Sequence, residues 1–136
     1  MENWLTAAII AFVLYGLWGF FPKLAVNYIS PGSAIIYEVA GTMAVGLLGL
    51  MIVGFRPDVH PKGILFAVLT GFTGMLGTLF FFYAVKNGKV SVVVSLTALY
   101  PLITIILAAI FLREPLSLRQ LLAMVLAMVA ILLFAA

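Results

Sequence analysis

The stretch WLTAAIIAFVLYGLWGFFPKLA, residues 4–25, decides the fold class of this chain. It holds one charged residue, Lys23, and a helix of about 20 apolar residues is long enough to cross the hydrocarbon core of a bilayer. Comparable apolar stretches follow, and we expect helical spans at about 4–25, 33–54, 63–84, 90–112 and 117–135. These stretches do not alternate as the strands of a membrane barrel do. The sequence therefore predicts an all-α integral membrane protein, one domain over residues 1–136 with five transmembrane helices and short loops.

The composition excludes a soluble globular domain. Hydrophobic residues make up 66% of the chain and charged residues 8%, whereas a soluble domain carries about 25% charged residues. The mean hydropathy of +1.33 agrees with this exclusion. The seven basic residues are spread along the chain, so nucleic acid is not an expected partner. We expect a multi-pass protein of the cell (inner) membrane, with the lipid bilayer as its surroundings.

The breaks between the apolar stretches carry residues that are typical of turns and helix ends. Residues 30–33 read SPGS, which suits a chain reversal with a helix N-cap at Ser33. Residues 86–89 contain Asn-Gly, a signal for a tight turn. Residues 113–115, REP, are expected to end the fourth span, and residues 117–120, SLRQ, form a capping box that opens the fifth.

An odd number of spans places the two ends of the chain on opposite sides of the membrane. Lys and Arg in short loops set the orientation of such a chain, and here they are nearly balanced. Arg56, Lys62, Arg113 and Arg119 fall on the N-terminal side, against Lys23, Lys86 and Lys89 on the other. Two interpretations fit this distribution: a single orientation with a cytoplasmic N-terminus, or insertion in both orientations followed by formation of an antiparallel homodimer.

Several short motifs occur in a fixed order along the spans. Residues 97–102 read TALYPL and residues 109–121 read AIFLREPLSLRQL, with a proline inside the fourth span and Leu-x-Glu closing it. Trp18-Gly19 and Lys23 lie in the first span, and residues 82–88 of the third read FYAVKNG. This order resembles an EamA repeat of the drug/metabolite transporter superfamily, and the resemblance covers essentially the whole chain.

The resemblance implies a small-molecule membrane transporter. Most members of the superfamily carry two repeats in one chain, so the single repeat here implies one inverted-repeat half that works as a homodimer. Rocking of the halves about a cavity lined by the first, third and fourth spans would give alternating access. The second span of such repeats often carries an Arg near its beginning, where this chain has Tyr37-Glu38. The alternatives are a non-transporting membrane subunit and a flippase for a lipid-linked group.

Glu38 is the acidic residue that lies clearly inside a predicted span. A charge at that depth costs a few kcal/mol on insertion scales, so such residues usually face a cavity or a partner. A carboxyl group that gains and loses a proton there is what a proton-coupled exchanger needs. Two structural alternatives remain: Glu38 reaches interfacial water, or it pairs with Lys23.

Two further helix faces carry candidate substrate-lining residues, which are Tyr15 and Trp18 in the first span and Thr97, Tyr100, Pro101 and Thr104 in the fourth. Aromatic rings suit an apolar or cationic substrate, but they also serve as anchors at the membrane interface. A proline within a span frees a backbone carbonyl and predicts a kink. The kink is either purely structural or part of the transport path.

Small residues line two more helix faces and predict close helix packing, because van der Waals contact drives helix association in lipid. They are Gly71, Gly74 and Gly77 in the third span and Ala123, Ala127 and Ala130 in the fifth. No nucleophile–base pair, phosphate-binding loop or metal-ligand set occurs in the sequence, and His60 stands alone in a loop. We therefore expect no enzyme, no catalytic residue, no cofactor and no metal.

Overall fold

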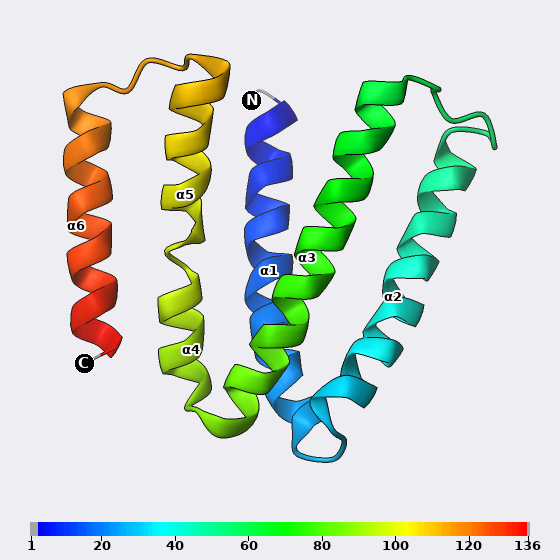
Figure 1. Cartoon of the computed structure of the whole chain (residues 1–136), viewed down its shortest axis with the longest axis horizontal. Helices are drawn as coiled ribbons and strands as arrows, with labels where there is room; N and C mark the ends of the chain where they lie inside the picture. The colour runs from blue at the N-terminus through cyan, green and yellow to red at the C-terminus, as the bar shows by residue number, and fades with distance from the viewer. Residues whose placement is uncertain (1–2, 136) are drawn as a thin grey trace. The chain divides into compact units, whose positions relative to one another are not determined.

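The computed structural model of the chain describes residues 3–135, and all regular structure among them is helical (Figure 1). The elements are α1 (Asn3–Val26), α2 (Pro31–Ile52), α3 (Pro61–Asn87), α4 (Val90–Thr97), α5 (Tyr100–Leu107), the π-helical segment η1 (Ala108–Leu112) and α6 (Leu118–Ala135). The chain divides into two compact units. We call Met1–Asn87, with α1 to α3, the three-helix unit, and Gly88–Ala136 the C-terminal unit.

Four helical stretches are long and apolar enough to cross a membrane, namely Trp4–Val26, Pro31–Ile52, Pro61–Asn87 and Val90–Leu112. They match the first four predicted spans, and the third is longer than expected at both ends. The all-α membrane fold is therefore confirmed. Helix α6 is shorter, with 18 residues, or about 27 Å at 1.5 Å per residue. Because this lies at the lower end of the range for a spanning helix, the fifth crossing stays a prediction.

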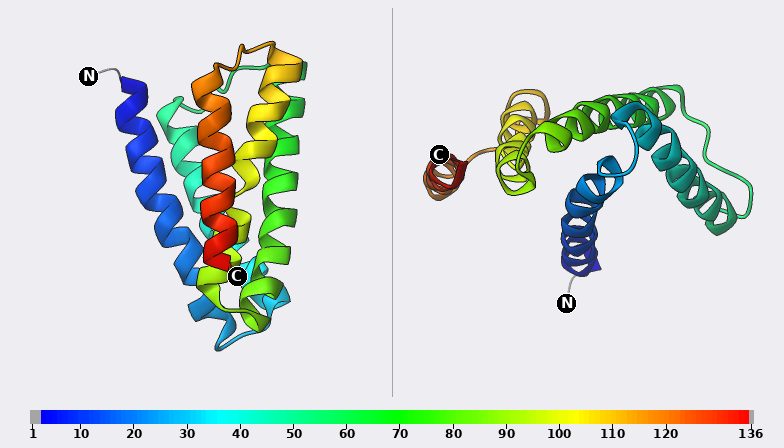
Figure 2. Two further views of the ribbon diagram at one scale, coloured as in Figure 1. Left: turned by 90° about the vertical axis from the view of Figure 1, so that its left-hand side faces the viewer. Right: turned by 90° about the horizontal axis from the view of Figure 1, so that it is seen from below.

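In the three-helix unit, α3 packs against both α1 and α2. Helices α1 and α2 lie close together at the turn that joins them and separate towards their other ends (Figures 1 and 2). The buried apolar side chains gather at the turn end of the unit, and they are Val26, Ala34, Phe81, Phe82 and Val85. The core of this unit is therefore small and confined to one end of its helices.

The turn between α1 and α2 corrects one sequence prediction. Ser30, and not Ser33, is the N-cap of α2: its hydroxyl accepts a hydrogen bond from the backbone N–H of Ser33 at 3.2 Å. Pro31 occupies the first helical position, where its fixed φ is favourable and its missing N–H costs no hydrogen bond. Because Pro31 occupies this position, the helix begins before the predicted cap. The backbone N–H of Ser33 is the donor of the capping hydrogen bond.

Helix α2 ends in a Schellman motif. The backbone N–H of Phe55 bonds the carbonyl of Leu50 at 2.9 Å, and the N–H of Gly54 bonds that of Met51 at 3.0 Å. This motif needs a left-handed residue just after the helix, and Gly54 supplies it with φ of 60°. The glycine therefore stops α2 where its apolar sequence would otherwise continue.

The fourth span is helical but interrupted, as Pro101 predicts. Helix α4 ends at Thr97 and α5 begins at Tyr100, because Pro101 has no N–H to donate to the carbonyl one turn earlier. The span closes in η1, and Arg113 follows in the left-handed conformation with φ of 56°. This stop at residues 113–115 agrees with the prediction from sequence.

The predicted capping box at the start of α6 is present. The Gln120 side-chain oxygen accepts from the backbone N–H of Ser117 at 2.8 Å, and the Ser117 hydroxyl accepts from the N–H of Gln120 at 3.3 Å. Two N–H groups that have no partner within the helix are thereby satisfied. Within the C-terminal unit, α6 packs against α4.

Replacing Phe82 with alanine is expected to destabilise the three-helix unit. Phe82 is 4% exposed, and truncation of a buried Phe costs about 3–5 kcal/mol in soluble proteins. We expect roughly 2 kcal/mol here, because apolar side chains gain little from leaving lipid and mainly packing is lost. The thermal unfolding midpoint in detergent measures this effect. The control is Phe80→Ala at a position 66% exposed, and equal losses in the two variants would contradict the assigned core.

Candidate functional site

Three side chains from the three helices lie at one depth of the three-helix unit. Trp18 comes about two turns before the end of α1, Glu38 about two turns after the start of α2, and Phe81 less than two turns before the end of α3. At 1.5 Å per residue each lies roughly 10 Å from its helix end. A hydrocarbon core is about 30 Å thick, so this level lies inside the helical spans and not at their ends.

The indole of Trp18 joins the other two side chains. Its Nε1–H donates a hydrogen bond to Glu38 Oε1 at 2.9 Å. Its ring stacks on that of Phe81, with ring centroids 5.1 Å apart and planes inclined by 27°. Phe81 is 5% exposed, so the core fixes the surface on which the indole rests. The sequence predicted Trp18 and Glu38 separately, and the structure brings them together.

Glu38 has an incomplete set of hydrogen bonds. Among the described side chains, its Oε2 is the buried oxygen or nitrogen atom that lacks a hydrogen-bond partner. Buried polar groups are usually satisfied, and an exception calls for an explanation such as a functional role or an absent ion. The carboxyl group is thus hydrogen-bonded at one oxygen and has no hydrogen-bond partner at the other.

Lys23 has a structural role near this site. Its ammonium group donates to the backbone carbonyl of Val85 at 2.6 Å. Val85 lies in the last turn of α3, which ends at Asn87, and carbonyls in a last turn have no partner within the helix. A cation also interacts favourably with the negative end of the helix dipole. Lys23 therefore caps α3, and the partner that the structure gives Glu38 is Trp18.

Replacing Lys23 with methionine is expected to lower the stability of the three-helix unit by about 1 kcal/mol, because the helix cap is lost while the aliphatic stem is kept. The thermal unfolding midpoint in detergent should fall by a few degrees. Lys86→Met, at an exposed position in the same last turn of α3, removes a charge without removing this bond. The capping role is wrong if the two variants lose equal stability.

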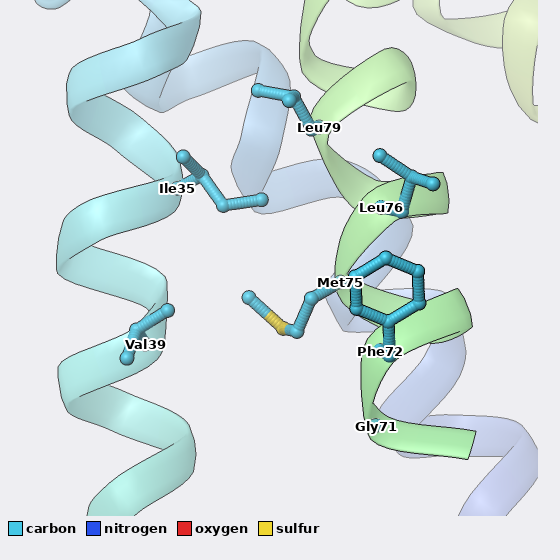
Figure 3. A pocket seen from close by; sticks show the side chains of 7 residues that line it. All are labelled: Ile35, Val39, Gly71, Phe72, Met75, Leu76 and Leu79. Carbon is cyan, nitrogen blue, oxygen red and sulfur yellow. The ribbon is translucent and has the colours of Figure 1, made fainter. Parts of the chain in front are cut away.

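An apolar groove of about 440 Å³ runs between α2 and α3, lined by Ile35, Val39, Gly71, Phe72, Met75, Leu76 and Leu79 (Figure 3). Ile35 and Val39 of α2 point towards Met75 and Leu79 of α3 (Figure 3). The sequence singled out Gly71 alone among these residues. No lining residue carries a charge, so in a bilayer the groove presents a surface that suits hydrocarbon.

The other predicted residues of the three-helix unit make few contacts within it. Tyr15 is 65% exposed. A Cβ atom added at Gly71, Gly74 or Gly77 would meet no atom within 4 Å beyond its chain neighbours and the backbone of its own helix. The carbonyl of Gly74 does accept a hydrogen bond from the hydroxyl of buried Thr78 at 2.9 Å. Roles in substrate binding for Tyr15, and in close packing for the glycines, stay predictions.

On the predicted polar face of the C-terminal unit, the two threonine hydroxyls donate to backbone carbonyls of their own span. Thr97 Oγ1 donates to the carbonyls of Val93 and Val94 at 2.9 and 3.1 Å. The Thr104 hydroxyl lies 3.5 Å from the carbonyl oxygen of Tyr100. Thr104 also lines a second groove of about 250 Å³. Tyr100 and Pro101 are exposed, as are Ala123, Ala127 and Ala130 on α6. The roles predicted for these residues stay predictions.

Sequence reasoning missed two contacts of this region, the stacking of Trp18 on Phe81 and the cap that Lys23 forms on α3. Phe81 lies within the run FFFY of residues 80–83, where every position is aromatic and no polar residue indicates which ring faces the core. Lys23 was considered as a partner of Glu38. A signal for the cap was available, because cations are favoured at the C-terminal ends of helices. Lys23 lies near the end of α1, and its partner carbonyl lies in the last turn of α3.

Comparisons with known proteins agree with this architecture. Residues 2–136 match the EamA-like transporter family. The chain is 27% identical over 135 residues to an uncharacterized protein of Methanocaldococcus jannaschii, covering 98% of this chain and 96% of that protein. No solved structure matches. Because the family match extends over nearly the whole chain, this protein belongs to the EamA-like transporter family, multi-pass membrane transporters of the drug/metabolite type.

Proposed function

We propose that this protein is a proton-coupled exporter or importer of small molecules that works as an antiparallel homodimer. The observation that carries the proposal is Glu38, a carboxyl group about 10 Å inside a membrane-spanning helix with one oxygen bound to Trp18 and one buried oxygen unpartnered. An ionisable group inside a membrane span is costly and usually functional. Coupling a proton to substrate movement is the function that best accounts for a carboxyl group at this depth.

The chemistry needs one titrating group with access to alternate sides of the membrane. In this proposal Glu38 takes up a proton when its side of the cavity is open and releases it after the two halves rock to the opposite opening. Substrate and proton then use the same carboxyl group in turn. Tyr15, which is exposed in the single chain, would line another part of the cavity between the two copies.

The dimer is supported by the extent of unburied helix surface in the three-helix unit. Its core lies at the turn end, whereas α1 and α2 separate towards the other end (Figure 1). The alignment with the M. jannaschii relative covers 96% of that protein, so nearly all of it corresponds to the one repeat described here. A second copy of the repeat, inverted in the membrane, would supply the missing half of the transporter.

Reconstitution of the purified protein in liposomes tests the proposal. A pH-sensitive dye inside the vesicles reports proton movement when a probe is added outside, and suitable probes are a primary amine, an amino acid and a hydrophobic cation. We expect at least one probe to drive saturable proton movement that protein-free liposomes lack. Probe flux without proton movement would overturn the coupling, and flux of no probe would favour a non-transporting subunit.

A further inference from the structure

We propose that Trp18 is the positioning residue for Glu38, that the coupling proton binds Glu38 Oε2, and that protonation weakens a direct tie between α1 and α2. The role in transport rests on the proposed function, but the protonation chemistry does not depend on it. Trp18 touches no substrate in this proposal. It acts through the carboxyl group, by fixing its orientation and by responding to its charge.

The position of the indole is fixed from two sides. Its N–H points to Glu38 Oε1 at 2.9 Å, and its face rests on Phe81 with ring centroids 5.1 Å apart. Stacked aromatic pairs favour separations of about 4.5–7 Å, and Phe81 is itself held in the core. Because α3 fixes Phe81, Trp18 holds the carboxyl group of α2 at a defined position relative to α3.

The hydrogen bond from Trp18 determines which oxygen takes the proton. Oε1 already accepts the indole N–H, and Oε2 is buried without a partner. The step adds one proton to the carboxylate and gives a neutral carboxylic acid whose O–H is on Oε2, with no bond to carbon made or broken. Oε1 then remains as the carbonyl-type acceptor, which still faces the indole.

Protonation changes the strength of the link between the helices. A hydrogen bond to an ionised carboxylate is roughly twice as strong as one between neutral groups. The Trp18–Glu38 bond joins α1 to α2 across 20 residues of sequence. Ionised Glu38 thus holds α1 against α2, and neutral Glu38 holds it less firmly. The three-helix unit thereby converts the protonation of one group into a change in helix association.

The pH response of Glu38 must be distinguished from that of the other titratable and charged groups of this unit. On α2 the neighbouring group is Tyr37, and the packed helices carry Tyr15 and Lys23 on α1 and Lys62, Tyr83 and Lys86 on α3. Arg56, Asp58 and His60 lie in the loop between α2 and α3, and Tyr28 lies in the turn between α1 and α2. Glu38→Gln leaves every one of these groups in place, so any pH response that this variant loses belongs to Glu38.

The emission of Trp18 tests the inference without a substrate. The chain has two tryptophans, so Trp4→Phe leaves Trp18 as the single reporter. In lipid nanodiscs we expect its emission to follow a one-group titration that Glu38→Gln abolishes. Phe81→Leu, which keeps apolar volume but removes the stacked ring, should reduce the amplitude. Emission that does not change with pH, or a titration that persists in Glu38→Gln, would overturn the inference.

Transport measurements separate the positioning role from a structural one. Trp18→Phe keeps an aromatic ring but removes the donor. We expect it to slow proton-coupled transport about tenfold and to move the midpoint of its pH profile by about one unit, with Phe81→Leu giving a smaller shift. An unchanged pH profile in folded Trp18→Phe contradicts the inference. If the emission of Trp18 titrates in a way that depends on Glu38 but no transport is observed, the inference holds and the proposed function is contradicted.

Discussion

Glu38→Gln is expected to reduce proton-coupled transport by about a hundredfold or more, the scale on which acid–base groups contribute to a rate. The variant keeps the volume of the side chain, and its amide oxygen still accepts the Trp18 N–H. The amide does not take up and release a proton as a carboxyl group does, so the titrating atom at the position of Oε2, which has no hydrogen-bond partner, is lost. Folding and dimerisation should therefore be retained while coupling is lost, as measured by probe-driven proton movement in liposomes alongside size-exclusion profiles.

Two further variants sharpen this test. Glu38→Asp should retain activity with an altered pH profile, because the shorter carboxyl group still titrates but no longer meets Trp18 at the same distance. Glu114→Gln removes an exposed acid outside the helices and should leave transport unchanged. If Glu38→Gln transports normally across the pH range, Glu38 is a structural or interfacial acid and the transport path must rest on Tyr15, Trp18, Thr97 and Tyr100.

Insertion of the chain in both orientations is the second large expected effect. A reporter fused to the C-terminus should be found on both sides of the membrane in one population, because the loop charges are nearly balanced. Asn27→Lys combined with Tyr28→Lys adds two cations at exposed positions in the turn between α1 and α2. This double variant should give a single orientation, and transport should fall at least tenfold as antiparallel pairs disappear.

The opposite loop offers a matched control. Val59→Lys combined with Asp58→Asn also raises the net charge by two, at exposed positions in the loop between α2 and α3. We expect the reverse orientation and the same loss of transport. Coexpression of the two double variants should restore activity, because each supplies one orientation. A single orientation of the unmodified chain with full activity would exclude the antiparallel homodimer and require a parallel dimer or another partner.

The fold was predictable because it depends on the length and composition of the apolar stretches, which single residues hardly alter. The ends of the helices were less predictable from the sequence, because they depend on individual turn residues. Ser30 and Ser33 are chemically equivalent caps, and the position of Pro31 between them decides which one is used. Pro101 interrupted the fourth span as expected.

The site was predictable in its members but not in its contacts. Glu38 stands out because it is an acid in an apolar helix, and Trp18 because it is a large polar-tipped ring. Their pairing joins two helices, and helix periodicity describes faces within one helix only. In an almost entirely apolar helix even the faces are poorly marked, because lipid and core accept the same side chains. That is why Phe81 could not be distinguished from its aromatic neighbours.

The cap formed by Lys23 has a consequence for how the chain enters the membrane. Its partner carbonyl belongs to Val85, 62 residues further along the chain. While α1 is being inserted, α3 has not yet been made, and the charge of Lys23 then contributes to the direction of insertion. Once α3 arrives, the same ammonium group becomes part of a helix end. The charge distribution present while α1 is inserted therefore differs from that of the finished protein, in which Lys23 is bonded to a helix end.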